Sequence, residues 1–131
     1  MIIDRLRKRI ARSEHEGGFT LIELLVVIII IGILLAIAIP SYLKFRDRAN
    51  ESAAKANVRS AIPAIEAYYA DNNTYAGVTL AGLQASYDAG IKNVSFGSTL
   101  NATTYCVQST VGQATYNKAG PSADIVSGAC S

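Results

Sequence analysis

The sequence has few of the side chains that carry catalysis or bind metals. Its 131 residues include no tryptophan, one methionine, one histidine and two cysteines. The histidine, His15, lies in a charged segment before the main hydrophobic run. The chain beyond it has no His–Cys–Asp constellation, no metal-ligand spacing and no phosphate-binding glycine motif. Asp71, Asp88 and Asp124 are too scattered to predict a calcium site. We therefore expect no enzyme and no metal or cofactor.

Charge is nearly balanced, because 12 Lys and Arg face 10 Asp and Glu, for a formal net charge of +2. Nucleic-acid-binding proteins usually gather basic residues on one face. Beyond Ala70 the sequence offers only Lys92 and Lys118 against three aspartates, so we expect no direct contact with nucleic acid. The length allows one modest domain at most and excludes a large multidomain enzyme.

One hydrophobic run dominates the sequence. From Leu24 to Ile39 it reads LLVVIIIIGILLAIAI, without a charged or hydrogen-bonding side chain. A helix over residues 19–39 would be roughly 30 Å long, about the hydrocarbon thickness of a bilayer. A buried core helix is the alternative, but so short a chain lacks the layers to cover a helix that is apolar on every side. The run therefore predicts a membrane-spanning helix.

The first eighteen residues form a charged leader. Basic residues outnumber acidic ones in it: Arg5, Arg7, Lys8, Arg9 and Arg12 against Asp4, Glu14 and Glu16. An ordinary secretory signal would use the run as its hydrophobic core and Ala36-Ile37-Ala38 as its cleavage site. That alternative places Glu23 inside the hydrophobic core and leaves the basic helix after Pro40 unexplained.

The orientation in the membrane depends on how basic residues flank the run. Those after it equal the leader's in number: Lys44, Arg46, Arg48, Lys55 and Arg59. The positive-inside count is thus a tie, and only the denser spacing of the leader's charges favours a cytoplasmic N-terminus.

The segment Gly17-Gly18-Phe19-Thr20-Leu21-Ile22-Glu23-Leu24-Leu25 resembles the prepilin signature of type IV pilins and of the pseudopilins of type II secretion. The resemblance is strongest over residues 17–75. It implies that a membrane-embedded prepilin peptidase cuts between Gly18 and Phe19 and then methylates the new amine of Phe19. Gly18 suits such a cut, because a backbone without a side chain can extend into a narrow cleft.

Glu23 stands among leucine and isoleucine residues at the start of the run. An ionised, unpaired carboxylate costs several kcal/mol in lipid, so its presence indicates a function and a partner. The nearest cation in a processed chain is the amine of Phe19. The resemblance implies that Glu23 acts in assembly, by neutralising this amine on a neighbouring subunit. The alternative is a carboxylate that only reaches the headgroup level of the membrane.

Gly32 within the run and Pro40 at its end also match the pattern of the family. Proline removes a helical hydrogen bond and glycine lowers helix propensity, so the helix between them can loosen. The resemblance implies that this stretch is extended in assembled filaments. A simple kink at the membrane boundary is the alternative.

Residues 41–70 predict an amphipathic continuation of the helix. Its apolar stripe has spacings of four, three and four: Val58, Ile62, Ile65 and Tyr69. The charges of residues 44–59 form either a solvated face or pairs between subunits of a filament. Glu51 precedes Lys55 by four residues, the favourable order for an ion pair. Pro63 should kink the helix.

Short segments rich in β-branched and aromatic residues follow a polar turn at residues 71–77. We expect antiparallel strands over 94–96, 105–111 and 114–117, with Gly112-Gln113 as a hairpin turn. Three or four such strands would cover the apolar stripe. This predicts an α+β fold, the pilin fold, in which a long N-terminal helix packs on a small antiparallel sheet.

Cys106 and Cys130 are the only cysteines. A segment that reaches an oxidising compartment would join them. The pair resembles the disulfide-bounded C-terminal region of many type IV pilins, whereas major pseudopilins commonly lack the bridge and rely on a calcium site.

These features together predict a type IV pilin precursor. Its parts are a cleaved leader (1–18), a transmembrane and polymerisation helix (19–40), an amphipathic second half of the helix (41–71), and the loop, sheet and disulfide-bounded region (72–131). We expect it to span the cytoplasmic membrane and then to form an extracellular homopolymer. The resemblance implies three further partners: a prepilin peptidase, an assembly ATPase and a platform protein. A type II secretion or competence pseudopilin, or a membrane-anchored binding module that never polymerises, are the alternatives.

Overall fold

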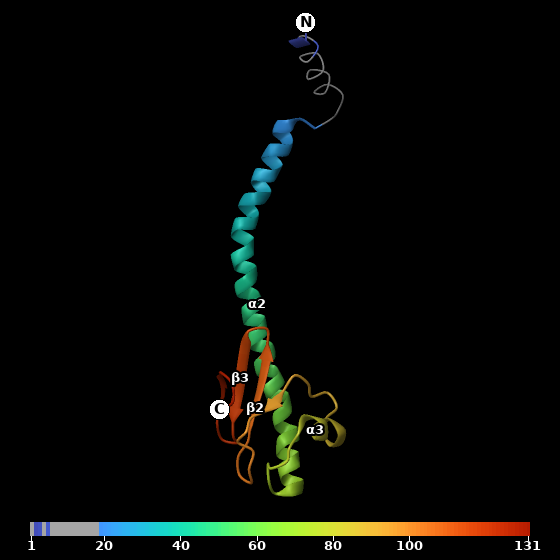
Figure 1. Cartoon of the computed structure of the whole chain (residues 1–131), viewed down its shortest axis with the longest axis vertical. Coiled ribbons are helices and arrows are strands. Elements are labelled where there is room, and N and C mark those ends of the chain that lie inside the picture. The colour runs from blue at the N-terminus through green and yellow to red at the C-terminus, as the bar shows by residue number, and fades with distance from the viewer. Residues whose placement is uncertain (1, 4, 6–18) are drawn as a thin grey trace. The chain divides into compact units, whose positions relative to one another are not determined.

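The computed structural model describes residues 2, 3, 5 and 19–131. These residues include a long helix, α2, a short helix, α3, and four strands (Figure 1). The bounds are α2 Leu21–Asn72, α3 Leu80–Ser86, β1 Ser95–Phe96, β2 Cys106–Val111, β3 Ala114–Ala119 and β4 Ile125–Ser127. The chain divides into two compact units, an N-terminal unit (Met1–Leu43) and a head (Lys44–Ser131).

Helix α2 is 52 residues long and is assigned without interruption through Gly32, Pro40 and Pro63. The predicted helical continuation beyond Pro40 is therefore confirmed, and the helix tolerates all three residues. It ends where Asn73 adopts a left-handed backbone, with φ of 55°. The Asn73 N–H donates to the carbonyl of Tyr69 at 2.7 Å, which caps the last turn. Asparagine accepts this conformation more readily than most residues, so the polar turn stops the helix as predicted.

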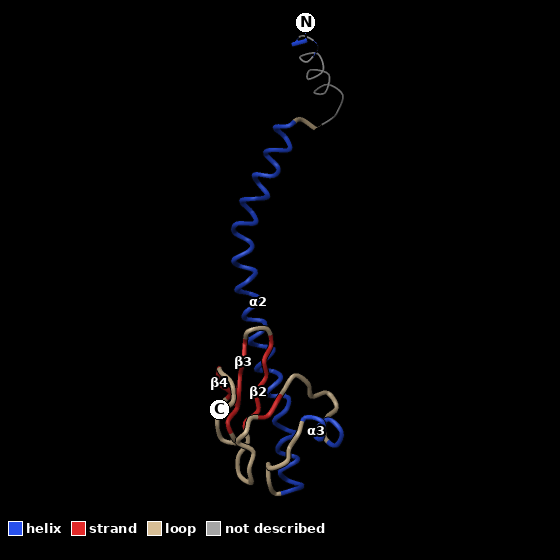
Figure 2. Tube along the Cα trace, in the orientation of Figure 1, coloured by secondary structure: helices blue, strands red, loops and turns tan. Residues whose placement is uncertain are grey.

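The head contains a four-stranded antiparallel sheet in the order β1-β2-β3-β4 (Figure 2). The β2–β3 ladder is the longest, and it runs from Cys106 opposite Ala119 to Val111 opposite Ala114. Gly112 has a φ of 60° in the turn between these two strands, so the predicted two-residue hairpin is confirmed. The fourth strand, β4, pairs with β3. The sequence predicts three or four strands, and the structure has four. With it, the predicted α+β fold is confirmed.

The core of the head lies between α2 and the sheet. Val58 and Ile65 of α2 and Val107 of β2 are fully buried. The predicted stripe is wrong at Ile62, which is only partly buried, while Ala61 has no exposed surface. The residues of α2 that are buried are Ala54, Val58, Ala61, Ala64 and Ile65. Alanines dominate this face because small side chains let a helix approach a sheet closely.

Helix α3 lies between the polar turn at residues 71–77 and the first predicted strand, where the sequence predicts a loop. Thr79 caps its start, and its hydroxyl accepts a hydrogen bond from the Gly82 N–H at 3.1 Å. Leu83 anchors the helix, since it is fully buried in the core cluster. The helix has only 7 residues, too few for a periodic pattern to stand out in the sequence.

A disulfide joins Cys106, on β2, to Cys130, near the C-terminus. Their Cα atoms are 5.9 Å apart, and 24 residues separate them in the sequence. Gly97 packs against this bridge, since a Cβ on Gly97 would lie 2.6 Å from the Cβ of Cys130. The Cys130 N–H also donates to Oε1 of Gln108 at 2.7 Å. The bridge and this hydrogen bond hold the C-terminal tail against the sheet.

We predict that replacing both cysteines, Cys106→Ser with Cys130→Ser, lowers the free energy of unfolding of the head by about 3 kcal/mol. The reason is that the bridge restricts the unfolded chain. Denaturant unfolding of the full chain in detergent measures the change. Adding reductant should lower the stability of the wild type to that of the double variant, which itself should not respond. Equal stability of the oxidised wild type and the double variant would contradict the prediction.

Candidate functional site

The first turn of α2 is closed by a reciprocal pair of hydrogen bonds between Thr20 and Glu23. The Thr20 hydroxyl accepts from the Glu23 N–H at 3.2 Å, and Oε2 of Glu23 accepts from the Thr20 N–H at 3.3 Å. This arrangement is a capping box, which satisfies two donors that a helix otherwise leaves without partners. The negative charge of Glu23 also lies at the positive end of the helix dipole.

Thr20 is a residue that the sequence analysis missed. The spacing of a threonine three residues before a glutamate, directly ahead of an apolar run, is the usual signal of a capping box. Glu23 is thus both a charge at the start of a membrane segment and a cap of the helix. The structure brings Thr20 and Glu23 together beside Phe19, which is 81% exposed. Gly18, the other residue of the expected cleavage site, lies outside the described residues.

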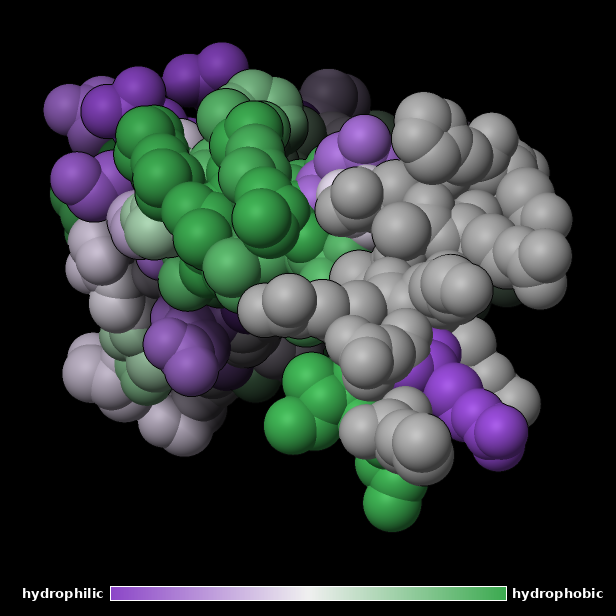
Figure 3. Space-filling view, turned by 90° about the horizontal axis from the view of Figure 1, so that it is seen from above, coloured by the Kyte–Doolittle hydropathy of each residue, from purple (hydrophilic) through white to green (hydrophobic). Residues whose placement is uncertain are grey.

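The apolar run is exposed along its whole length. No residue of its most hydrophobic window is buried, and side chains such as Leu24 and Ile39 are each 52% exposed. Large hydrophobic side chains gather at the surface in Figure 3, and those that are exposed belong mainly to Phe19–Phe45. By length and composition, α2 is the one helix among the described residues that could cross a membrane. Such a surface requires lipid or protein to cover it.

Gly32 and Pro40 both lie within α2. A Cβ on Gly32 would meet no atom within 4 Å, so packing inside this chain does not require a glycine there. The position leaves room for close approach by another molecule. The extension of the stretch from Gly32 to Pro40 in a filament stays a prediction, since the stretch is helical in this single chain.

The head half of α2 carries charged side chains that form no ion pairs with other described residues. Across the described residues, no lysine or arginine nitrogen lies within 4.0 Å of a carboxylate oxygen. The expected pair of Glu51 with Lys55 is therefore absent there. The ammonium of Lys55 lies instead 4.8 Å from the centre of the Tyr116 ring. A tyrosine face attracts a cation and competes with an exposed carboxylate, whose pairing in water is worth little.

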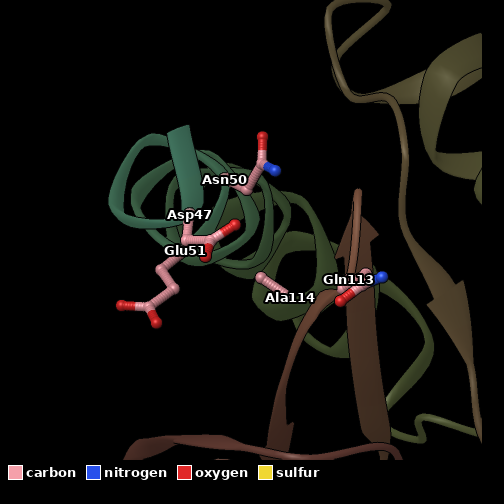
Figure 4. Close-up of a pocket in the computed structure, with 5 residues that line it drawn as sticks. All are labelled: Asp47, Asn50, Glu51, Gln113 and Ala114. Atoms are coloured by element: carbon pink, nitrogen blue, oxygen red, sulfur yellow. The ribbon is translucent and has the colours of Figure 1, made fainter. Parts of the chain in front are cut away.

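A cleft of about 200 Å³ lies between this charged part of α2 and the β2–β3 turn. Two carboxylates and two amides contribute to its lining, which consists of Asp47, Asn50, Glu51, Gln113 and Ala114 (Figure 4). Among the described residues, no group of three or more His, Cys, Asp or Glu side chains could hold a metal. Carboxylates thus make the lining of this cleft acidic.

Three tyrosine side chains of the head pack against one another. Tyr69 and Tyr75 stack with ring centres 4.5 Å apart, and Tyr75 also lies 4.9 Å from Tyr105. The hydroxyl of Tyr75 donates to the carboxylate of Glu66, at 3.0 Å to Oε2. These tyrosines belong to the core, so they do not form an exposed site for ligand stacking.

Burial and nearby carboxylates raise the pKa of several tyrosines. Burial, with the hydrogen bond and charge of Glu66, raises the pKa of Tyr75 to about 12. Burial also raises the pKa of Tyr105, with a smaller contribution from Glu66. The hydrogen bond to Asp71 is the main cause of the raised pKa of Tyr87. These groups stay protonated at neutral pH and act as hydrogen-bond donors or core side chains.

The fold and site define a class of protein: an α+β head that continues from a long apolar helix, with a capped acidic residue at the start of that helix. Comparison with known proteins agrees with this class. Residues 15–39 match the prokaryotic N-terminal methylation motif, which includes Phe19 and Glu23.

Relatives of the chain include components of pili and of a secretion system. The type IV wide pilus major component PilA4 of Thermus thermophilus is 41% identical over 95 residues, which cover 72% of each chain. The type IV major pilin protein PilA of Myxococcus xanthus is 46% identical over 68 residues, 51% of this chain and 31% of the relative. The type II secretion system core protein G of Pseudomonas aeruginosa is 39% identical over 74 residues, 56% of this chain and 51% of the relative.

The chain belongs to the type IV pilin family. The match to the Thermus thermophilus protein covers most of both chains, and the methylation motif falls on the residues that the sequence analysis selected. The chain spans about a third of the length of the Myxococcus xanthus relative and about half of the length of the Pseudomonas aeruginosa relative. These relatives are structural components, and the chain is likewise a structural subunit and not an enzyme.

We predict that the stability of the head falls as the pH rises from about 10 to about 12. The folded chain keeps the Tyr75 proton up to a pKa of about 12, whereas the unfolded chain releases it near the ordinary tyrosine pKa of 10.0. Above pH 10 deprotonation therefore favours the unfolded state. Tyr75→Phe should make the decline shallower, and Tyr42→Phe, at an exposed tyrosine, should leave it unchanged. Thermal unfolding across this pH range checks both, and equal slopes for all three chains would refute the assignment.

Proposed function

We propose that the chain is the precursor of a type IV pilus subunit. It is cleaved between Gly18 and Phe19, methylated at the amine of Phe19, and polymerised through its apolar helix. The observation that carries the proposal is the carboxylate of Glu23, placed at the start of a helix whose apolar run, Leu24 to Ile39, is exposed throughout. The match to the methylation motif supports the cleavage and the methylation.

Two environments can cover the apolar run in turn. In the membrane, lipid covers the helix, and in a filament, the helices of other copies cover it. Burial of each large apolar side chain is worth about 1.5–3 kcal/mol, so the exposed surface from Leu24 to Ile39 provides a strong drive for either state. A filament of identical subunits requires a contact that does not close on itself, which one helix face packed on a different face provides.

Glu23 has a separate role in each state. In the precursor it caps the helix, and one oxygen, Oε2, accepts from the Thr20 N–H. The structure gives Oε1 of Glu23 no partner among the described residues, so this oxygen remains able to accept a second hydrogen bond. Cleavage would create an amine on Phe19. Pairing of Glu23 with that amine on a neighbouring subunit would neutralise two charges that the filament interior would otherwise bury alone.

The proposed partners follow from this life cycle. A prepilin peptidase cuts and methylates the chain, and an assembly ATPase and a platform protein move subunits from the cytoplasmic membrane into the filament. The N-terminus faces the cytoplasm in the precursor. The head lies on the other side, where the disulfide of Cys106 and Cys130 can form. The finished pilus is extracellular.

A second candidate is a pseudopilin of a type II secretion or competence system. The similarity to the core protein G of Pseudomonas aeruginosa favours it. The pilus subunit is preferred because the pilus component of Thermus thermophilus matches over a larger share of both chains. A membrane-anchored module that never polymerises has no use for a carboxylate at Glu23.

Mass analysis of the chain from membranes and from sheared extracellular material tests the proposal directly. We expect the sheared form to begin at Phe19, with a methylated amine and an intact disulfide. A Gly18→Val variant should stay unprocessed, because the added side chain obstructs the cut. A wild-type chain that starts at Ile39 would indicate a conventional secreted protein. An uncut chain confined to membranes would indicate an anchor, and either result overturns the proposal.

The role of Glu23 in assembly predicts that Glu23→Ala abolishes filaments and leaves membrane insertion intact. Thr20→Ala is the matched control, because it removes the other half of the capping box and keeps the carboxylate. Loss of the cap alone costs about 1 kcal/mol, which the packing of a long helix can absorb. Quantifying sheared filaments of both variants checks the prediction. Abundant Glu23→Ala filaments, or equal loss in both variants, would contradict the pairing role.

A further inference from the structure

The acidic cleft of the head continues the face of α2 that packs on the sheet. Four residues of α2 follow one another at intervals of four, three and four, so all of them lie on one side of the helix: Asp47, Glu51, Ala54 and Val58. The sheet stops at the β2–β3 turn, where a Cβ on Gly112 would lie 2.5 Å from the amide nitrogen of Asn50. Beside this contact, Asp47 and Glu51 are exposed and line the cleft (Figure 4).

A basic stripe runs along the adjacent side of the same helix. Lys44 and Arg48 are four residues apart and both are exposed. Each stands three residues before an acid of the cleft, Asp47 or Glu51, a spacing at which helical side chains can pair. The structure nevertheless contains no ion pair among its described residues. One copy therefore presents two acids and two bases on neighbouring faces, which are complementary between copies.

The two acid–base combinations share one order and one offset along the helix. Asp47 follows Lys44, and Glu51 follows Arg48, by three residues, or about 4.5 Å of helix rise. In a helical filament, one symmetry operation relates each copy to the next. It therefore displaces every residue by the same distance along the filament axis. If the filament axis runs along this part of α2, one displacement would therefore bring both Asp47 and Glu51 level with a basic residue of the next copy.

We propose that Asp47 and Glu51 of one copy bind Lys44 and Arg48 of the next copy, beside the β2–β3 turn. The inference rests on the proposed polymerisation and names a surface of the head that takes part in it. The occupant is a second copy because complementary charges at the matching offset belong to this chain. Such pairs fix the register between subunits, and like charges in their place would cost several kcal/mol.

Charge reversal tests the proposal in cells that make the full chain. The base-reversed variant carries Lys44→Glu and Arg48→Glu, and the acid-reversed variant carries Asp47→Lys and Glu51→Arg. The combined variant carries all four changes and restores opposite charges across the interface. Arg59→Glu is the matched control, since Arg59 is exposed on the same helix and has no acid at the corresponding offset. Membrane levels, processing and the thermal stability of the head are measured for every variant.

We expect each half-reversed variant to yield about tenfold less sheared filament than the wild type, which corresponds to about 1.4 kcal/mol per subunit contact. The combined variant should recover to within about twofold, and Arg59→Glu should match the wild type. Normal filament yield from stable, processed half-reversed variants, or no recovery in the stable combined variant, overturns the pairing and leaves the proposed function intact. A wild-type chain that forms no filaments overturns the proposed function and the pairing with it.

Discussion

A helix that is apolar on every side must be covered, and one chain of this size cannot cover it. From Leu24 to Ile39 the side chains of α2 are exposed, and the core of the head includes no residue of this run. The hydrophobic effect has no direction, so lipid and a set of identical helices are both adequate cover. This single requirement explains why the chain is suited both to residence in a membrane and to assembly with its own copies.

Direction and register must then come from polar groups, because apolar contacts alone specify neither. In the proposed assembly, Glu23 is one such group at the beginning of the helix, where Thr20 and the helix dipole stabilise the carboxylate. In the proposed pairing between copies, the exposed charges of the head half of α2 are a second set. A polar group in an apolar interface costs free energy when it is unpaired, so it discriminates strongly between correct and incorrect contacts.

The head is stabilised separately from this exposed surface. Its core joins the alanine-rich face of α2 to the sheet and to Leu83 of α3, and the disulfide holds the tail on β2. Because its stability does not depend on the apolar run, the head can stay folded while the covering of that run changes. The same helix thus belongs to both units, with α2 carrying the core face in one and the exposed apolar surface in the other.

Features that depend on neighbours in the sequence could be predicted from the sequence alone. The apolar run, the end of α2, the hairpin at Gly112 and the segment around Glu23 are of this kind, since composition and local backbone preferences decide them. The tertiary structure decided which residues meet. It buried Ala61 in place of Ile62, placed Thr79 and Leu83 in a short helix, and left an acidic cleft where the sheet ends. Burial and pairing depend on where a distant strand lies, and no local pattern contains that information.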